Sequence, residues 1–230
     1  MTDGGARAQL AGLASRGVVW PTVPTVPTVP TGRHPTRPAA VLVLFGVLDD
    51  RPADHVSRAV PADLDVLLVG RAASLSHHPG QVAFPGGRLD PDDAGPAEAA
   101  LREAVEETGL DPDGVEILGL LGELPLSVSD HLVVPVLAWW SRPSRVAVVD
   151  HGESAAVFRA PVADLLDPAN RRSATLPLTG RRYAGPAFLV PHDAGQHVVW
   201  GFTALVLDRL FDELGWTEPW DRRRTIPAPL

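Results

Sequence analysis

An uninterrupted apolar stretch from Ala39 to Leu48 constrains the fold more than any other feature of the sequence. It is too short to cross a bilayer, and it lacks the polar alternation of a half-exposed strand, so it predicts a buried strand. Asp65 to Arg71 predicts a second buried strand. The chain is long enough to bury a core around them, with 230 residues, of which 45% are hydrophobic and 21% charged. This composition excludes wholesale disorder.

The charged residues exclude several classes of function. Twenty basic residues, all of them arginine, stand against 28 acidic ones and give a formal net charge of −8, so no general attraction to nucleic acid or to an anionic membrane is expected. The absence of lysine excludes Schiff-base chemistry, and the absence of cysteine excludes disulfides, thiolate metal sites and cysteine nucleophiles. Met1 to Leu13 has no apolar core of signal-peptide length. We therefore expect a soluble, cytoplasmic protein that holds any polyanionic substrate locally, through a few arginines or through metal ions.

A repeated Pro-Thr-Val triplet runs from Pro21 to Gly32. Such a repeat favours extended polyproline geometry and cannot form a helix. We interpret it as a linker or an extended arm, with a docking motif for a partner as the alternative. Before the repeat, residues 5–16 are predicted to form a short helix with Leu10 and Leu13 on one side.

These features divide the chain into three parts. Residues 1–37 form an N-terminal extension, residues 38–215 form a single domain, and residues 216–230 form a C-terminal tail that is loosely held from Thr217. On this division, a chain that begins near His34 is expected to fold and function normally.

Predicted strands outnumber predicted helices within residues 38–215. Residues 97–108 are predicted to be helical, because Pro96 can occupy the first turn and Gly109 stops the helix. A second, amphipathic helix is predicted at 201–214 from apolar residues at helical spacing. The other predicted elements are strands at 81–84, 115–121, 131–140 and 154–158, a turn at 85–87, a short helix at 162–166, and a hairpin that joins 188–190 to 197–199. The mixture predicts an α/β sandwich.

Three of the nine glutamates, Glu103, Glu106 and Glu107, fall on one face of the helix predicted at 97–108. Their carboxylates repel one another unless a cation lies among them. Oxygen ligands without a thiolate favour a hard ion, so Mg²⁺ or Mn²⁺ is the expected cofactor. Arg102 either pairs with one of the glutamates and fixes its rotamer, or approaches a phosphate. The alternative is an ordinary solvated acidic helix face.

The segment from Gly87 through Leu110 resembles the Nudix box, whose core reads R-E-U-x-E-E-x-G-U with U aliphatic. The matching residues are Arg102, Glu103, Ala104, Glu106, Glu107, Gly109 and Leu110. The resemblance implies a Nudix α/β/α sandwich with a mixed β-sheet. It also implies hydrolysis of a diphosphate bond in a nucleoside diphosphate derivative, with divalent cations held by the three glutamates. The general box has a glutamate eight residues before the arginine, where this chain has Ala94, and Gly87 is one residue too far upstream.

That departure is itself similar to a subfamily, the coenzyme A pyrophosphatases. Their lengthened box has an aspartate nine residues before the arginine, as Asp93 is here. Their upstream signature, L-L-x-x-R, a spacer and then G-Q-V-x-F-P-G-G, is matched by Leu67 to Arg71 and by Gly80 to Gly87, although Ser76 stands where the spacer usually has a basic residue. The likeness covers about residues 38–214. It implies cleavage of coenzyme A or acyl-coenzyme A to adenosine 3′,5′-bisphosphate and 4′-phosphopantetheine or its acyl form.

The resemblance also nominates site residues outside the acidic helix. Glu153, in a loop, is the candidate to complete the metal site or act as general base, with an ordinary surface acid as the alternative. The substrate-binding candidates are Arg71, His78, Gln81, Gly86 and Gly87. The two glycines would let the backbone approach the phosphates closely. Trp139 and Trp140 are interpreted as core residues, with stacking on adenine as the alternative.

Two other functions stay open at this point. A Nudix hydrolase acting on ADP-ribose, NADH or a nucleoside triphosphate would differ only in loops. A non-catalytic Nudix module that binds a ligand or a protein would predict decay of the metal glutamates, whereas all three are present. The expected partner is a small nucleotide substrate, with a homodimer left open.

Overall fold

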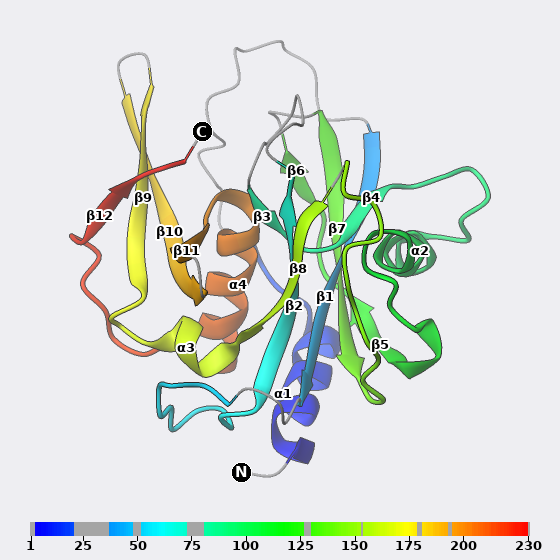
Figure 1. The fold of residues 1–230 in the computed structure, drawn as a ribbon, viewed down its shortest axis with the longest axis horizontal. Coiled ribbons are helices and arrows are strands. Elements are labelled where there is room, and N and C mark those ends of the chain that lie inside the picture. The colour runs from blue at the N-terminus through cyan, green and yellow to red at the C-terminus, as the bar shows by residue number, and fades with distance from the viewer. Residues whose placement is uncertain are drawn as a thin grey trace.

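The computed structural model describes residues 3–20, 37–47, 52–72, 81–126, 130–152, 154–178, 181–192 and 195–229. The helices are α1 (Asp3–Arg16), α2 (Pro96–Thr108), the 3₁₀ turn η1 (Pro112–Gly114), α3 (Val162–Leu166) and α4 (Gly201–Leu214). The strands are β1 (Arg37–Val47), β2 (Leu64–Arg71), β3 (Val82–Ala83), β4 (Gly86–Arg88), β5 (Val115–Leu120), β6 (Leu124–Leu126), β7 (His131–Trp140), β8 (Ser154–Pro161), β9 (Arg171–Leu178), β10 (Arg181–His192), β11 (Gly195–Val199) and β12 (Thr225–Pro227). Figure 1 shows their arrangement.

A mixed sheet at the centre of the molecule is built around the two apolar stretches, which form β1 and β2 as predicted. Its main path runs β3-β2-β1-β7-β5, while β4 pairs with β1, β6 with β7, and β8 with β2. The β1–β7 pairing is parallel, and the other strand pairings that the structure describes in this sheet are antiparallel. The fold is therefore α/β with a mixed sheet, as the sequence predicted.

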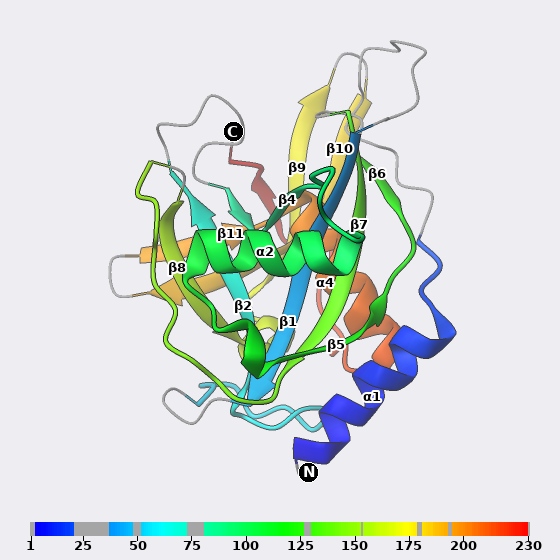
Figure 2. The same cartoon turned by 90° about the vertical axis from the view of Figure 1, so that its right-hand side faces the viewer.

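One face of this sheet is covered by α2, which lies across β2, β1 and β7 (Figure 2). Small side chains on α2, Ala99, Ala100 and Ala104, pack against alternate residues of the sheet, including Leu42 and Leu44. Alanine allows the helix axis to approach the sheet closely, which brings the polar side of α2 near the strand ends.

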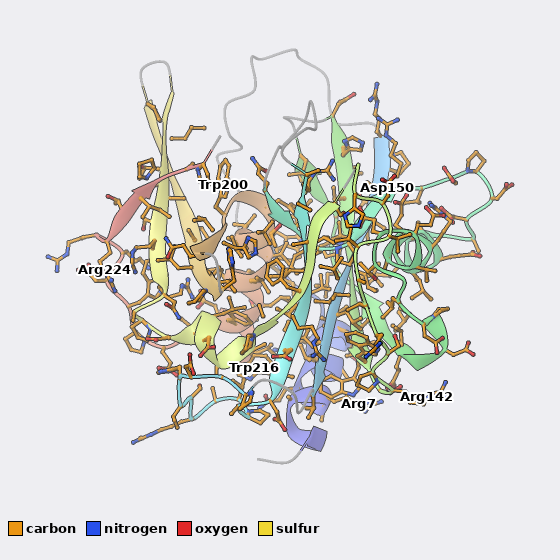
Figure 3. The ribbon with its side chains drawn as sticks, in the orientation of Figure 1. Arg7, Arg142, Asp150, Trp200, Trp216 and Arg224 are labelled. Atoms are coloured by element: carbon orange, nitrogen blue, oxygen red, sulfur yellow. The ribbon has the colours of Figure 1, made fainter. Side chains whose placement is uncertain are left out.

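The opposite face is covered by α4 and α1. Val43 and Phe45 of β1 share a core with Leu10 and Leu13 of α1, which are fully buried. Trp216, labelled in Figure 3, packs into the same core, and its indole Nε1 donates to the Gln9 side chain at 2.7 Å. The predicted helix at 5–16 is thus confirmed. This packing leads us to expect that a chain beginning near His34 does not fold normally, since that chain would lack both leucines.

A second sheet, with strand order β11-β10-β9-β12, lies beyond α4 (Figure 1). The predicted hairpin is confirmed, with Phe188 opposite Val199 and Val190 opposite His197. The prediction of a loosely held tail is wrong, because β12 pairs in parallel with β9 and the Ala228 amide donates to the Thr175 carbonyl at 2.9 Å. Short strands such as β12 lack an apolar run, so only their tertiary partners define them.

The remaining local predictions have mixed outcomes. Helices α2, α3 and α4 begin and end within a residue of the predicted limits, and Trp139 and Trp140 are buried core residues. The turn predicted at 85–87 is wrong, because β4 begins at Gly86 and pairs with β1. The Pro-Thr-Val repeat lies outside the described residues. None of the described helices is long and apolar enough to cross a membrane.

One carboxylate in the central sheet is expected to make stability depend on pH. Asp65 of β2 is 3% exposed, and burial raises the pKa of its carboxyl from 3.8 to about 7. Between these values the folded chain binds a proton that the unfolded chain does not, so stability falls as pH rises and the loss is complete above pH 7. We expect Asp65→Asn to gain about 4 kcal/mol over the wild type at pH 8 and almost nothing at pH 4. Urea unfolding at both pH values, with Asp63→Asn as control, measures the free energy of unfolding of Asp65→Asn relative to the wild type. An equal gain in stability at pH 4 and pH 8 would contradict the raised pKa of Asp65.

Candidate active site

The acidic face predicted from the sequence belongs to α2. Pro96 opens this helix, and Gly109 ends it in the left-handed conformation at φ 67°, with its amide donating to the Val105 carbonyl at 2.9 Å. With its alanines against the sheet, α2 presents Glu103 and Glu107 as partly buried and Glu106 as exposed. The helix therefore holds all three carboxylates on a firmly anchored element.

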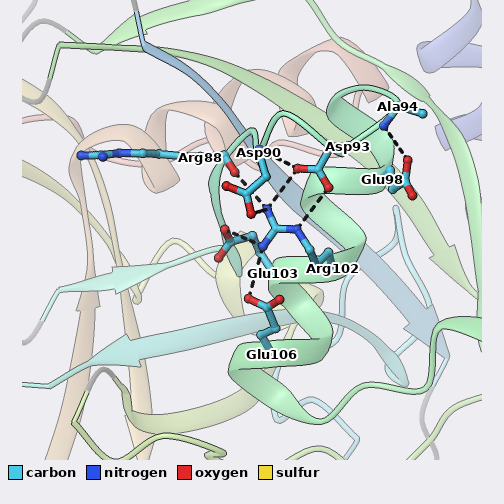
Figure 4. Close-up of polar contacts among 8 residues, drawn as sticks. All are labelled: Arg88, Asp90, Asp93, Ala94, Glu98, Arg102, Glu103 and Glu106. Carbon is cyan, nitrogen blue, oxygen red and sulfur yellow. Dashed lines mark hydrogen bonds and ion pairs between the residues drawn. The ribbon is translucent and has the colours of Figure 1, made fainter.

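The cation among these carboxylates is Arg102. Its Nη1 donates to Oε1 of Glu103 at 3.1 Å and to Oε2 of Glu106 at 3.2 Å (Figure 4). Its Nε and Nη2 donate to the two carboxylate oxygens of Asp93, each at 3.1 Å, and Nη2 also donates to the Arg88 carbonyl at 3.1 Å. A bidentate pair fixes the plane of a guanidinium, so Asp93 sets the orientation from which Arg102 positions the glutamates.

The electrostatics of this network differ from group to group. The hydrogen bonds from Arg102 and from the Asp90 amide lower the pKa of the Asp93 carboxyl, which stays ionised. Burial raises the pKa of the Glu103 carboxyl; Arg102 opposes that rise, and the charges of Glu106 and Asp90 add to it. An additional cation nearby would lower the pKa of the Glu103 carboxyl.

Two glycines of β4 bring the backbone against the helix. The Gly86 amide donates to Oε2 of Glu107 at 3.1 Å, so this N–H is engaged by a carboxylate. A Cβ on Gly86, where φ is 152°, would lie 2.4 Å from the Ala40 carbonyl oxygen. A Cβ on Gly87 would lie 2.4 Å from the carboxyl carbon of Glu103. Gly86 requires glycine because the backbone of β1 lies against it, whereas a side chain at Gly87 would have to displace the Glu103 carboxylate.

The chemistry of this donor set fits a hard divalent cation. The donors are all carboxylate oxygens, and Arg102 contacts only one oxygen of Glu103 and one of Glu106. In the part of the chain that the structure describes, no three acidic or histidine side chains converge closely enough to hold an ion as they stand. Small rotamer changes of Glu103, Glu106 and Glu107 would therefore accompany binding.

Of the other predicted site residues, the structure describes Arg71 and Gln81. Arg71 ends β2, and its amide donates to the Gln81 carbonyl at 2.9 Å, so the structure brings these two together. The buried Nε of Arg71 has no hydrogen-bond partner among the described residues. His78 and Glu153 lie outside the described residues.

The sequence analysis did not foresee the part played by Asp93 and Asp90. The available signals in the sequence are the acidic residues Asp90, Asp92 and Asp93 before the helix and the position of Asp93 nine residues before Arg102. The structure adds that the loop before α2 folds back over Arg102, with Asp90 Oδ2 3.7 Å from Nη2.

We expect Gly87→Ala to displace the Glu103 carboxylate and to change the stability of the fold very little. The added methyl must displace the Glu103 carboxylate, which is the end of a flexible side chain, so the free energy of unfolding should change by less than about 1 kcal/mol. The apparent affinity for Mg²⁺ in a hydrolysis assay should fall by about tenfold or more. A matched Gly95→Ala substitution, where a Cβ meets nothing within 4 Å, should leave the apparent affinity for Mg²⁺ unchanged. Equal affinity for Mg²⁺ in Gly87→Ala and the wild type would contradict the close contact between Gly87 and Glu103.

Comparison with known proteins identifies the family. A model of the NUDIX domain matches residues 52–177, more than half of the chain. The chain belongs to the Nudix family. This match contains β4, α2 and every described carboxylate of the site.

Several Nudix proteins are similar in sequence. The chain is 35% identical over 150 residues to Nudix hydrolase 22, chloroplastic, of Arabidopsis thaliana, a match that covers 64% of this chain and 49% of that protein. It is 40% identical over 151 residues to the uncharacterized Nudix hydrolase NudL of Enterobacter sp. (strain 638), covering 65% of this chain and 75% of that protein. The chain thus spans about half the length of the Arabidopsis relatives it matches.

A solved structure shows the same Nudix fold. The Nudix hydrolase RenU of M. smegmatis superimposes with a TM-score of 0.50 and 18% identity, over 81% of this chain and 90% of that one. At this identity the likeness concerns the fold alone.

Proposed function

We propose that this Nudix protein hydrolyses the diphosphate bond of coenzyme A or acyl-coenzyme A, giving adenosine 3′,5′-bisphosphate and 4′-phosphopantetheine or its acyl form. The observation that carries the proposal is the cluster of Glu103, Glu106 and Glu107, gathered by Arg102 against β4. Such a concentration of carboxylates beside a glycine-lined strand suits a substrate whose own charge is neutralised by metal ions.

Each residue has a distinct role in this proposal. Glu103, Glu106 and Glu107 hold Mg²⁺ or Mn²⁺, which when bound neutralises the diphosphate and makes a water more acidic. Arg102 is a positioning residue, because its donors are directed at Asp93 and the glutamates. Gly86 and Gly87 position these carboxylates rather than the phosphates, since the Gly86 amide donates to Glu107 and the Glu103 carboxylate fills the space beside Gly87. Glu153 remains the predicted general base.

The chemical step is an addition of water across one phosphoanhydride bond. The water oxygen forms a bond to one phosphorus, the bridging P–O bond breaks, and the bridging oxygen leaves on the other phosphate. The proton lost by the water passes to a nearby base. The chain orients the reacting groups and supplies the carboxylates that would hold the metal ions. The products are two phosphate monoesters.

Arg71 supports the assignment of coenzyme A among diphosphate substrates. Coenzyme A differs from ADP-ribose and NADH by its 3′-phosphate, which calls for a cation. Ser76 stands where the subfamily usually has a basic residue, and Arg71 has a buried donor, Nε, without a hydrogen-bond partner among the described residues. We therefore assign Arg71 to the substrate phosphates, with His78 and Gln81 as further contacts.

A substrate panel on the purified protein with Mg²⁺ or Mn²⁺, with products resolved by mass, tests this function. Coenzyme A should have a kcat/KM roughly ten- to a hundredfold above that of 3′-dephospho-coenzyme A, since a charge-assisted phosphate contact is worth about 1.5–3 kcal/mol. Arg71→Ala should shrink that ratio, whereas the exposed Arg58→Ala should not. Equal rates on the two compounds would remove the argument for the 3′-phosphate. Faster cleavage of ADP-ribose, NADH or a nucleoside triphosphate would assign the protein to a different Nudix substrate.

A further inference from the structure

A large cavity of about 1340 Å³ lies beside β8, away from the acidic helix. Its described walls come from the end of β1, the start of β2, β8, α3, the β10–β11 hairpin and residues 143–146. Figures 1 and 2 show β8 descending past β2 to α3, with the β10–β11 hairpin close by. None of the described lining residues belongs to α2 or β4, so the cavity is separate from the candidate active site.

The most unusual group in the wall is Asp65. It sits in an otherwise apolar strand, opposite Gly46 of β1 and Pro161 of β8. Its side chain is 3% exposed, and its Oδ1 has no hydrogen-bond partner in the part of the chain that the structure describes. A buried carboxylate oxygen without a partner is costly, and Asp65 belongs to the wall of a cavity whose ligand could supply one.

The charges around Asp65 leave it short of positive partners. Burial is the main cause that raises the pKa of its carboxyl; Arg159 opposes it, and the charges of Asp63 and Asp164 add to it. Asp164, also in the cavity wall, has a raised pKa for the same main reason, burial, with a smaller contribution from Asp54. Among the described residues, the cavity wall thus contains three carboxylates, Asp54, Asp65 and Asp164, against two arginines, Arg145 and Arg159.

The other end of the cavity is flat and aromatic. The rings of Phe158 and His197 are stacked, with centroids 4.6 Å apart and planes at 10°, and His192 lies 4.3 Å from His197. Burial lowers the pKa of the His197 imidazole, and His192 lowers it further, which favours the neutral ring. This aromatic wall therefore offers a surface for an aromatic ring rather than for a charge.

We propose that this cavity is a second ligand site, which takes a small organic cation whose N–H group donates to Oδ1 of Asp65 and whose flat apolar part contacts Phe158 and His197. The ammonium or guanidinium group supplies the donor that Oδ1 of Asp65 lacks, and the ring covers the apolar wall.

Benzylamine and benzyl alcohol test the proposal as matched probes, because they share a ring and differ in the charged group. Titration of the full chain, followed by calorimetry and by the NMR signals of His197, should show saturable binding of benzylamine and weaker binding of benzyl alcohol. Asp65→Asn should weaken benzylamine roughly ten- to a hundredfold, since it removes an ionic hydrogen bond. Asp63→Asn, which removes a nearby charge but no acceptor in the wall, should change the affinity by less than about threefold.

A pH series provides a readout that needs no variant. An alkylammonium group stays charged up to pH 8, so the affinity of the wild type should rise from pH 6 to pH 8 as Asp65 ionises. The other titratable and charged groups that face the cavity are Asp54, Asp164, Arg145, Arg159, His192 and His197. In Asp65→Asn, most of this rise in affinity between pH 6 and pH 8 should disappear. His197→Ala should weaken benzylamine binding at both pH values.

Two results would overturn the proposal: benzylamine binding equally to Asp65→Asn and the wild type, or benzyl alcohol binding as tightly as benzylamine. Glu107→Gln should bind benzylamine as the wild type does, because Glu107 lies outside the cavity. The test therefore stands even if the protein proves not to hydrolyse coenzyme A.

Discussion

Replacing Glu107 by Gln is expected to reduce turnover by about a hundredfold or more while leaving the fold intact. The change keeps the side-chain length and an oxygen that can accept from the Gly86 amide, but it removes one charge from the proposed metal ligands. Stabilisation of charge by a bound metal is worth several kcal/mol, and each 1.36 kcal/mol is a factor of ten in rate. Relief of repulsion on α2 should keep the free energy of unfolding within about 1 kcal/mol.

The matched control for this experiment is Glu98→Gln on the same helix. Glu98 Oε2 accepts from the Ala94 amide at 2.6 Å, and no dashed line joins Glu98 to Arg102, Asp93 or the other glutamates in Figure 4. Its kcat with saturating Mg²⁺ should equal that of the wild type. Near-normal turnover of Glu107→Gln under the same conditions would show that the site has been assigned to the wrong residues.

Removal of residues 1–33 is expected to unfold the protein or leave it largely unfolded at 25 °C. The truncation deletes α1, and with it the fully buried Leu10 and Leu13, the Gln9 partner of Trp216 and the ion pair of Arg7 with Glu116 on β5. Loss of one buried leucine costs about 2–5 kcal/mol, and the net stability of a domain is only about 5–15 kcal/mol.

Single substitutions test the contribution of α1 without removing the rest of the N-terminal segment. Leu10→Ala should lower the free energy of unfolding by about 2–5 kcal/mol in urea titrations, whereas Val19→Ala, at a side chain 79% exposed, should change it by less than about 0.5 kcal/mol. An unfolding midpoint of the truncated chain equal to that of the full chain would show that α1 is dispensable.

The local elements followed from the sequence wherever one segment contained its own signal. An uninterrupted apolar run can only be stable when buried, so β1 was predictable without its neighbours. The limits of α2 were predictable because Pro96 and Gly109 act on backbone within one turn. The three glutamates were found for the same reason, since helical periodicity alone places them on one face.

Contacts between distant segments were decided only by the tertiary structure. Strand β12 exists because Thr225 to Pro227 meets β9, and nothing in its own sequence requires a strand. From the sequence, the guanidinium of Arg102 could have contacted a phosphate or a glutamate. In the structure the 89–95 loop brings Asp93 against it, so its donors bind carboxylates.

Asp65 shows the same division most clearly. A lone aspartate in an apolar strand is visible in the sequence, but whether it meets water, an arginine or an empty volume depends on β8 and α3, which come about 90 residues later. Short-range sterics and periodicity act within a segment, so a sequence displays them directly. Burial and charge depend on which distant surfaces meet, and these are set only once the chain has folded.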